Sequence, residues 1–312
     1  MASQEAELIE QAELAGAIAS RERGLWGDAF YRLSRNRLAM AGIVLLIVVA
    51  GVAAASANID AVQRYDPYSD QLYDHIQEAP SGSHFFGTDN LGRDNWARVW
   101  TGVSISLQIG IGTQIVVLII GLLVGATAAL GGRFTDNVMM RLTDVTYAFP
   151  DLLFIILIRS VLVGRDWQVI SNPKLQIIMA IAFVNWTIIA RLVRGQMLSL
   201  AERDFVLAAR ALGASPWRVV VQHMLPNSLG PVIVAVTFGI PIAIFAEAAL
   251  GFIGFGLPPP TASLGRLVSD GYAYVQVNYW VVVFPAAAVA VLMLCFTFVG
   301  DGLRDALDPR TR

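Results

Sequence analysis

The sequence predicts an all-α membrane protein with six transmembrane helices and both termini on the cytoplasmic side. Its 312 residues are 56% hydrophobic and 15% charged, whereas soluble domains are about 45–50% apolar and about 25% charged. The apolar residues gather in six stretches, each long enough to cross about 30 Å of hydrocarbon. These stretches are 38–57, 105–130, 141–163, 175–195, 228–256 and 278–300. Most Lys and Arg residues fall on the side that holds both ends, which sets the predicted orientation.

Several protein classes are excluded by composition and by missing motifs. A net charge of −2 without runs of like charge disfavours a nucleic-acid-binding protein. The single cysteine, Cys295, excludes a disulfide framework and a Cys-based zinc site, and its apolar neighbours predict a small core residue. The motifs G-x-x-x-x-G-K-[ST], H-E-x-x-H and G-x-S-x-G do not occur. We therefore expect no ATPase site, no catalytic residue and no enzyme activity in this chain alone.

Residues 1–37 form a predicted cytoplasmic tail of two parts. Residues 3–20 are rich in Ala and Glu, which predicts a solvated helix. Hydrophobic residues then recur at helical spacing, at Leu25, Trp26, Ala29, Phe30 and Leu33. Three arginines lie alongside this hydrophobic pattern. This pattern predicts an interfacial amphipathic helix that leads into the first transmembrane helix at 38–57. The alternative is a plain cytoplasmic helix that packs on a partner.

An extracytoplasmic loop is predicted at residues 58–104. It carries seven acids against three arginines, and prolines and glycines punctuate it. His75 and His84 lie nine residues apart in this loop. Two histidines without helical i, i+4 spacing are more often surface residues than ligands, so we predict no metal site.

Residues 105–300 form the predicted core of five helices, and residues 301–312 form a cytoplasmic tail. Gly121 and Gly125 have the spacing of a close helix–helix contact. Prolines inside apolar runs remove backbone hydrogen bonds and permit kinks. Four such prolines are present, at Pro150, Pro231, Pro241 and Pro285.

Three ionisable side chains fall inside the predicted helices, namely Asp151, Arg159 and Glu247. Charges in hydrocarbon are costly, so each is a candidate for lining a solute path. Asp151 lies ten residues after Arg141, about 15 Å along a helix, which predicts a position near mid-membrane. Arg159 and Glu247 fall in the outer halves. The alternatives are packing of Asp151 against a partner subunit, and structural pairing or snorkelling of the other two.

The most informative segment outside the membrane is residues 196–227, here named the inner loop. Helical spacing of apolar residues runs up to Gly213, which predicts a helix C-terminus there. Ser215 followed by Pro216 predicts the N-cap and first position of a second short helix. Small residues around the turn would let another protein approach closely. Since a simple connection would need far fewer residues, we predict a docking element.

The inner loop resembles the "EAA" loop of ABC-importer permeases. Its sequence is LAARALG at 207–213, then nine residues, then HMLP at 223–226, whereas that family has Glu-Ala-Ala, three residues, Gly, nine residues and Ile-x-Leu-Pro. Leu207 replaces the motif Glu, and His223 replaces the Ile. Four further segments resemble the C-type permease subunit of the dipeptide/oligopeptide class: RNRLAMAG at 35–42, GTDNLGRD at 87–94, AEAALGFIGFG at 246–256 with PPPTASLG at 258–265, and GDGLRDALDP at 300–309.

The resemblance implies a type I ABC-importer permease fold in a bacterial cytoplasmic membrane. It implies a heterodimer with a second homologous permease, two cytoplasmic subunits that bind ATP and Mg, and an extracytoplasmic peptide-binding protein. The implied activity is ATP-driven import of peptides or similar small solutes by alternating access. It also implies that the inner loop contacts an ATPase through Ala208, Ala209, Arg210, Gly213, Ala214, Ser215, Pro216 and Trp217.

Two other classes of protein are weighed against this interpretation. A proton-coupled secondary transporter would place its site between internal repeats. The sequence has no convincing repeat, and such a transporter would leave the inner loop unexplained. A membrane-embedded enzyme would need a clustered nucleophile, base or metal set, which three scattered histidines do not provide.

Overall fold

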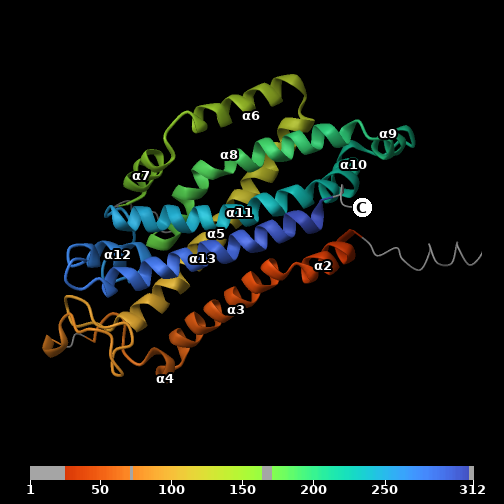
Figure 1. The fold of residues 1–312 in the computed structure, drawn as a ribbon. Coiled ribbons are helices and arrows are strands. Elements are labelled where there is room, and N and C mark those ends of the chain that lie inside the picture. Colours follow the sequence, from red (N-terminus) through yellow and green to blue (C-terminus); the bar gives the residue numbers. More distant parts are fainter. Residues whose placement is uncertain (1–24, 71–72, 164–170, 309–312) are drawn as a thin grey trace, which may run out of the picture.

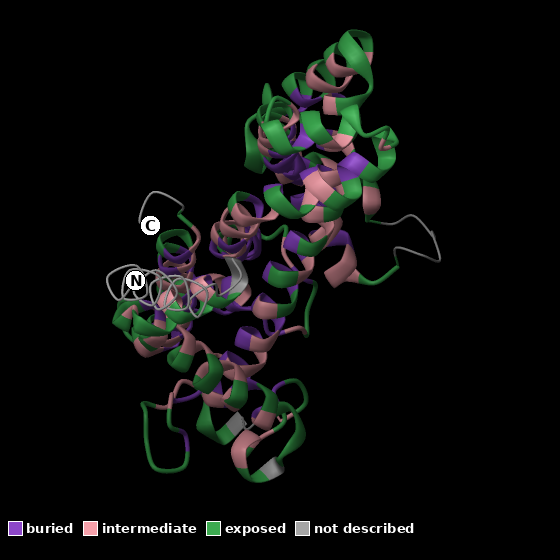
Figure 2. Cartoon of the chain, turned by 90° about the vertical axis from the view of Figure 1, so that its right-hand side faces the viewer, coloured by how far each residue is buried: buried purple, intermediate pink, exposed green. Residues whose placement is uncertain are grey.

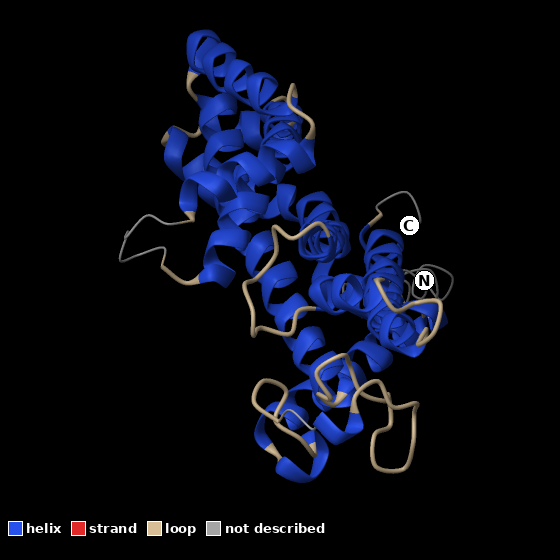
Figure 3. Ribbon diagram, turned by 90° about the vertical axis from the view of Figure 1, so that its left-hand side faces the viewer, coloured by secondary structure: helices blue, strands red, loops and turns tan. Residues whose placement is uncertain are grey.

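The computed structural model describes residues 25–308 except 71–72 and 164–170. The described chain is helical with irregular loops and has no strand, as Figure 3 shows. Long helices run side by side in an elongated bundle (Figure 1). They are α3 (Arg37–Asn58), α5 (Asn95–Leu130), α8 (Pro173–Ala201), α11 (Leu225–Phe252) and α13 (Trp280–Leu307). The prediction of an all-α membrane protein is confirmed.

The third predicted transmembrane helix, 141–163, is not a single straight helix. It falls within α6 (Gly132–Tyr147) and α7 (Asp151–Leu162), which are bent by 95° at the break between them. Pro150 lies at this break as the N-cap residue of α7 in an extended conformation. A proline disfavours helical geometry in the residue before it, so the chain leaves the helix at this point. The five long helices and this broken pair give up to six membrane crossings by length and composition.

The bounds of three helices differ from those of the predicted apolar stretches. Helix α5 begins at Asn95, ten residues before the predicted 105, because the Asp94 side chain accepts a hydrogen bond from the N–H of Ala97. Residues 95–104 of the predicted extracytoplasmic segment are therefore the first turns of α5. Helix α11 ends at Phe252 rather than at 256. Helix α13 continues to Leu307, so most of the tail predicted at 301–312 is helical.

The core of the bundle lies where α5, α8 and α11 meet. Figure 2 shows buried residues on the facing sides of the helices and exposed residues on the outward sides. Gly121 and Gly125 of α5 lie against Ile189 and Ala190 of α8, where a side chain on either glycine would collide. The predicted close helix–helix contact is confirmed. Small residues let the two helix backbones approach closely, and the resulting van der Waals packing stabilises helix pairs in a membrane.

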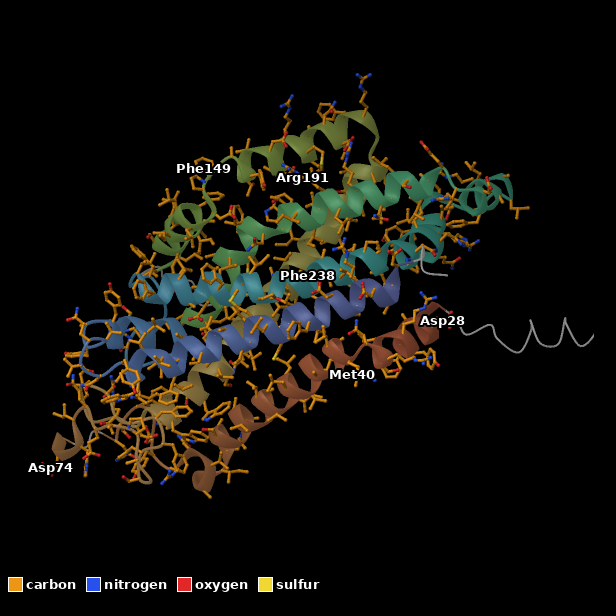
Figure 4. The ribbon with its side chains drawn as sticks, in the orientation of Figure 1. Asp28, Met40, Asp74, Phe149, Arg191 and Phe238 are labelled. Atoms are coloured by element: carbon orange, nitrogen blue, oxygen red, sulfur yellow. The ribbon has the colours of Figure 1, made fainter. Side chains whose placement is uncertain are left out.

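The two ends of the bundle carry different elements. Helix α2 (Leu25–Arg35), α9 (Asp204–Ala211) and α10 (Pro216–Val219) lie at one end with the C-terminal end of α13 (Figure 1). Helix α4 (Asp60–Gln63), the 3-10 turn η1 (Tyr73–His75) and α12 (Leu264–Tyr272) lie at the other. Figure 4 shows Asp28 and Asp74 at these opposite ends. The inner loop and α2 thus lie at the same end of the bundle. The solvated helix predicted at 3–20 lies outside the described residues.

Helix α6 is held beside α8 by ion pairs near the inner-loop end. Arg194 donates to both carboxylate oxygens of Asp136, and Arg191 lies 2.9 Å from Asp144. The bend at residues 148–150 then carries α7 away from the direction of α6. This arrangement places the start of α7, with Asp151, on an exposed surface of the chain.

Candidate functional site

The inner loop folds into two short helices, as its sequence predicts. Helix α9 covers 204–211 and helix α10 covers 216–219. Val206 is fully buried in a cluster with Met197 of α8 and Met224, which lies just before α11. The Phe205 ring lies 6.5 Å from the ring of His223. These contacts anchor α9 to the ends of two long helices.

A tight turn joins the two short helices. The N–H of Gly213 donates to the carbonyl of Arg210 at 2.9 Å, and the N–H of Ala214 donates to the carbonyl of Ala209 at 3.1 Å. This pair of bonds is the Schellman arrangement that ends a helix, and it places Gly213 in the left-handed region at φ +82°. The predicted helix terminus at Gly213 is confirmed, and glycine is the residue with least strain in that conformation.

Helix α10 leads without a break into α11. The Ser215 side chain caps α10 by accepting from the N–H of Arg218, and Pro216 occupies the first turn, as predicted. A π-helical turn, η2 (Val220–Met224), follows and joins α11 at Leu225. Residues 216–252 therefore form one helical rod of 37 residues.

The surface of the inner loop is open and partly apolar. Six of the eight predicted docking residues are exposed and two, Ala209 and Ala214, are half-buried. Trp217 is 74% exposed and Leu212 is 89% exposed. Trp is among the residues most enriched at the energetic centres of protein–protein contacts, so Trp217 is the candidate anchor. Leu207, at the position of the motif Glu, also faces outward.

The structure places the three ionisable candidates in different surroundings. Glu247 is fully buried and its Oε2 accepts a hydrogen bond from Ser106 at 2.9 Å, between α11 and α5. Arg159 is nearly buried, donates to the carbonyl of Gly256, and lines a cavity with Arg266. Asp151 is exposed at the first turn of α7. Since the helix breaks before Asp151, the ten residues from Arg141 do not lie on one straight helix, and the depth of Asp151 in the membrane stays a prediction.

The sequence does not predict two sets of polar side chains that the structure brings together. An apolar groove between α5, α8 and α11 is lined by Gln114 and Asn185. Uncharged amides were passed over because only charged residues were considered as candidates. At the other end, the guanidinium of Arg98 is 1% exposed and lies 3.7 Å from Asp89 and 3.8 Å from Asp270. Only the folded loop brings these distant residues together.

Comparison with known proteins gives two matching family models. Residues 117–312 match the "Binding-protein-dependent transport system inner membrane component" model. Residues 24–80 match the "N-terminal TM domain of oligopeptide transport permease C" model.

Individual relatives match over nearly the whole chain. The oligopeptide transport system permease protein OppC of Bacillus subtilis is 39% identical over 297 residues, which are 95% of this chain and 93% of that protein. The dipeptide transport system permease protein DppC of Alkalihalophilus pseudofirmus is 37% identical, with 92% and 90% covered. OppC of Escherichia coli K12 is 37% identical, with 93% of each covered.

Solved structures share the fold. The inward-facing MetNI methionine ABC transporter matches with a TM-score of 0.54 and 22% identity, covering 66% of this chain and 94% of that one. The chain shares the type I ABC-importer permease fold, and its five to six apolar helices make it a multi-pass inner membrane protein. The chain belongs to the family of inner membrane components of binding-protein-dependent transport systems.

Proposed function

We propose that this chain imports peptides as one of two permease subunits in an ATP-driven complex, and that its inner loop binds a cytoplasmic ATP-binding subunit. The observation that carries the proposal is the exposed loop of two short helices, held rigidly by buried Val206 and by the turn at Gly213. ATP and Mg would be bound by the partner ATPases. A second homologous permease and an extracytoplasmic peptide-binding protein would complete the complex.

The geometry of the loop supports a mechanical role. Trp217 sits on the same helical rod as the transmembrane part of α11, and Val206 ties α9 to α8. Closure of the ATPase pair would push on α9 and α10 together. Because the helical chain is continuous from α10 into α11, the push would be passed to the transmembrane part of α11, with Pro231 and Pro241 as points where it can bend. Tilting of α11 against α5 would open the path alternately to each side.

The path itself would use the polar groups that the helices leave facing one another. Gln114 and Asn185 line the groove between α5, α8 and α11. Arg159 and Arg266 line a cavity at the outer end of α7 and α11, where they would attract a carboxylate. We retain Asp151 as a candidate for a peptide's amino group. Glu247 is enclosed within the subunit, so its role in the path would require helix movement.

The peptide cargo is supported by relatives whose names are oligopeptide and dipeptide permeases. The alternative, a proton-coupled secondary transporter, is disfavoured because the relatives and the solved structures of this fold are components of ABC transporters. It would also leave the exposed inner loop without a partner.

Affinity purification from detergent-solubilised membranes tests the proposal. The tagged chain should bring down a second permease and two ATP-binding subunits, and hydrolysis of ATP should rise when peptide-loaded binding protein is added. Trp217→Asp should remove the ATP-binding subunits and leave the second permease bound.

Val277→Asp is the matched control, because Val277 is 75% exposed at the opposite end of the bundle. It should leave the ATP-binding subunits bound. Recovery of the chain without any ATP-binding subunit, or equal recovery with Trp217→Asp and with wild type, would refute docking through the inner loop.

A further inference from the structure

Three side chains of the extracytoplasmic loop form a cluster that the sequence does not predict. His75, Glu78 and His84 each offer a ligand atom, and these atoms lie within 4.8 Å of one another. The chain folds back between residues 78 and 84, so the nine-residue spacing brings the two imidazoles to a centroid distance of 5.8 Å. His84 is only 2% exposed, which contradicts the expectation that both histidines are surface residues.

His84 is oriented by a buried carboxylate. Its Nδ1 lies 2.8 Å from Oδ2 of Asp94, and both side chains are 2% exposed. The Tyr65 ring stacks on the imidazole at 4.8 Å. When the Nδ1–H group of neutral His84 donates a hydrogen bond to the carboxylate, Nε2 carries a free lone pair. This carboxylate–histidine arrangement is the one that orients histidine ligands in metal sites.

His75 and Glu78 are fixed by the same hydroxyl group. The Thr88 hydroxyl donates to the carbonyl of His75 and accepts from the N–H of Glu78 at 2.8 Å. The N–H of Thr88 also donates to the carbonyl of Glu78 at 3.1 Å. The Asn278 amide donates to the Gln77 side chain at 2.8 Å. The backbone that presents both side chains is therefore held in place.

We propose that His75, Glu78 and His84 bind a divalent transition-metal ion, with Zn²⁺ as the best match. Two imidazoles and one carboxylate suit Zn²⁺, whereas Ca²⁺ and Mg²⁺ prefer oxygen ligands. Bonds of about 2.0–2.2 Å in a tetrahedral site place ligand atoms about 3.3–3.5 Å apart. The Nδ1 of His75 is now 2.7 Å from Oε1 of Glu78. Small side-chain rotations would bring all three ligands to the required spacing.

The ion would tie the loop to the start of α5. His84 contacts Asp94, and Asp94 caps α5 through the N–H of Ala97. A bond from the metal to His75 and Glu78 would join the 75–78 segment to this cap. The fourth coordination position would hold water or a ligand from outside the chain. The site lies at the bundle end away from the inner loop, as Figure 4 shows for Asp74.

Zinc binding by the assembled complex in lipid nanodiscs tests the proposal. After removal of metal with a chelator, equilibrium dialysis against Zn²⁺ should show about one more ion per complex for wild type than for His75→Ala. Glu78→Gln should weaken binding at this site at least about tenfold. Asp74→Asn is the matched control, because it removes a neighbouring exposed acid, and its binding should equal wild type.

A second measurement separates a built site from loosely held zinc. Co²⁺ in place of Zn²⁺ should give the intense visible absorption of four-coordinate cobalt in wild type and in Asp74→Asn, and not in His75→Ala. Equal zinc content in wild type and His75→Ala would overturn the proposal. Loss of binding in Asp74→Asn as large as in His75→Ala would overturn it too, because it would indicate only general attraction by the acidic loop.

Discussion

The turn at Gly213 determines how firmly the two helices of the inner loop are held, and Gly213→Ala tests this directly. Gly213 has a φ of +82°, and a Cβ built there meets no atom within 4 Å. The substitution therefore causes no collision, and its cost is backbone strain alone. A non-glycine residue in the left-handed region costs about 1–2 kcal/mol. Asparagine tolerates this conformation better, so Gly213→Asn should cost less.

This strain should appear as weaker binding of the ATP-binding subunit. Because the free loop can relax out of the strained turn and must regain it on binding, a cost of about 1–2 kcal/mol sets an upper limit of about a 5- to 30-fold lower affinity. The assay is a titration of a fluorescently labelled ATP-binding subunit into nanodiscs that contain the two permeases. Wild type should bind most tightly, Gly213→Asn less tightly and Gly213→Ala least. Peptide uptake should fall in the same order, while the amount of inserted permease stays constant.

Gly51→Ala is the matched control for this series. Gly51 lies in α3, away from the inner loop, and a Cβ there also meets nothing within 4 Å. It has no left-handed φ, so the affinity for the ATP-binding subunit should not change. Equal affinities for wild type and Gly213→Ala would refute the claim that a rigid turn is needed for docking. A drop with Gly51→Ala equal to that with Gly213→Ala would refute its location.

Two further predictions concern the extracytoplasmic end. Arg98→Met should lower the free energy of unfolding by about 3 kcal/mol, because it removes one partner of the buried ion pair between Arg98 and Asp89. The loss is at the low end of the range for buried pairs, because Arg93 still contacts the Asp89 carboxylate. An unchanged thermal midpoint in nanodiscs would contradict this prediction. The backbone N–H groups of Ser69 and Tyr68 donate hydrogen bonds to the Asp66 carboxylate and lower its pKa. The stabilisation from ionised Asp66 is therefore complete above the pKa of the unfolded state and is lost as pH falls through the pKa of the folded state. Asp66→Asn should therefore flatten the acid side of a curve of stability against pH. Parallel curves for wild type and Asp66→Asn would contradict this prediction.

Features set by nearby residues could be predicted from the sequence. The apolar runs located the long helices because only helices satisfy their backbone groups in hydrocarbon. Gly213, Ser215 and Pro216 predicted the end of α9 and the start of α10, since caps depend on residues within one turn. The match to the observed loop follows from this locality.

Features set by distant residues could not be predicted in the same way. The break before Asp151 was expected only as a kink at Pro150, because an apolar run does not reveal that two helices diverge by 95°. The burial of Glu247 depends on Ser106, which lies 141 positions earlier. The cluster at His84 depends on how the loop folds back. In each case the partner is chosen by the tertiary fold.

Several sequence predictions remain to be tested by experiment. The orientation of the bundle still rests on the distribution of Lys and Arg. The docking residues and the three ionisable path candidates also stay predictions. The exposure of the docking residues agrees with their proposed role, while the burial of Glu247 favours structural pairing with Ser106 over direct contact with a peptide.

Uptake of a radiolabelled peptide into proteoliposomes tests the central claim most directly. The vesicles would contain this chain with a second permease, two ATP-binding subunits and the peptide-binding protein. Accumulation should require ATP on the side of the ATP-binding subunits, persist when a protonophore abolishes the pH gradient, and stop with Trp217→Asp. Uptake that follows an imposed pH gradient without ATP, or that is unaffected by Trp217→Asp, would contradict an ATP-driven importer coupled through the inner loop.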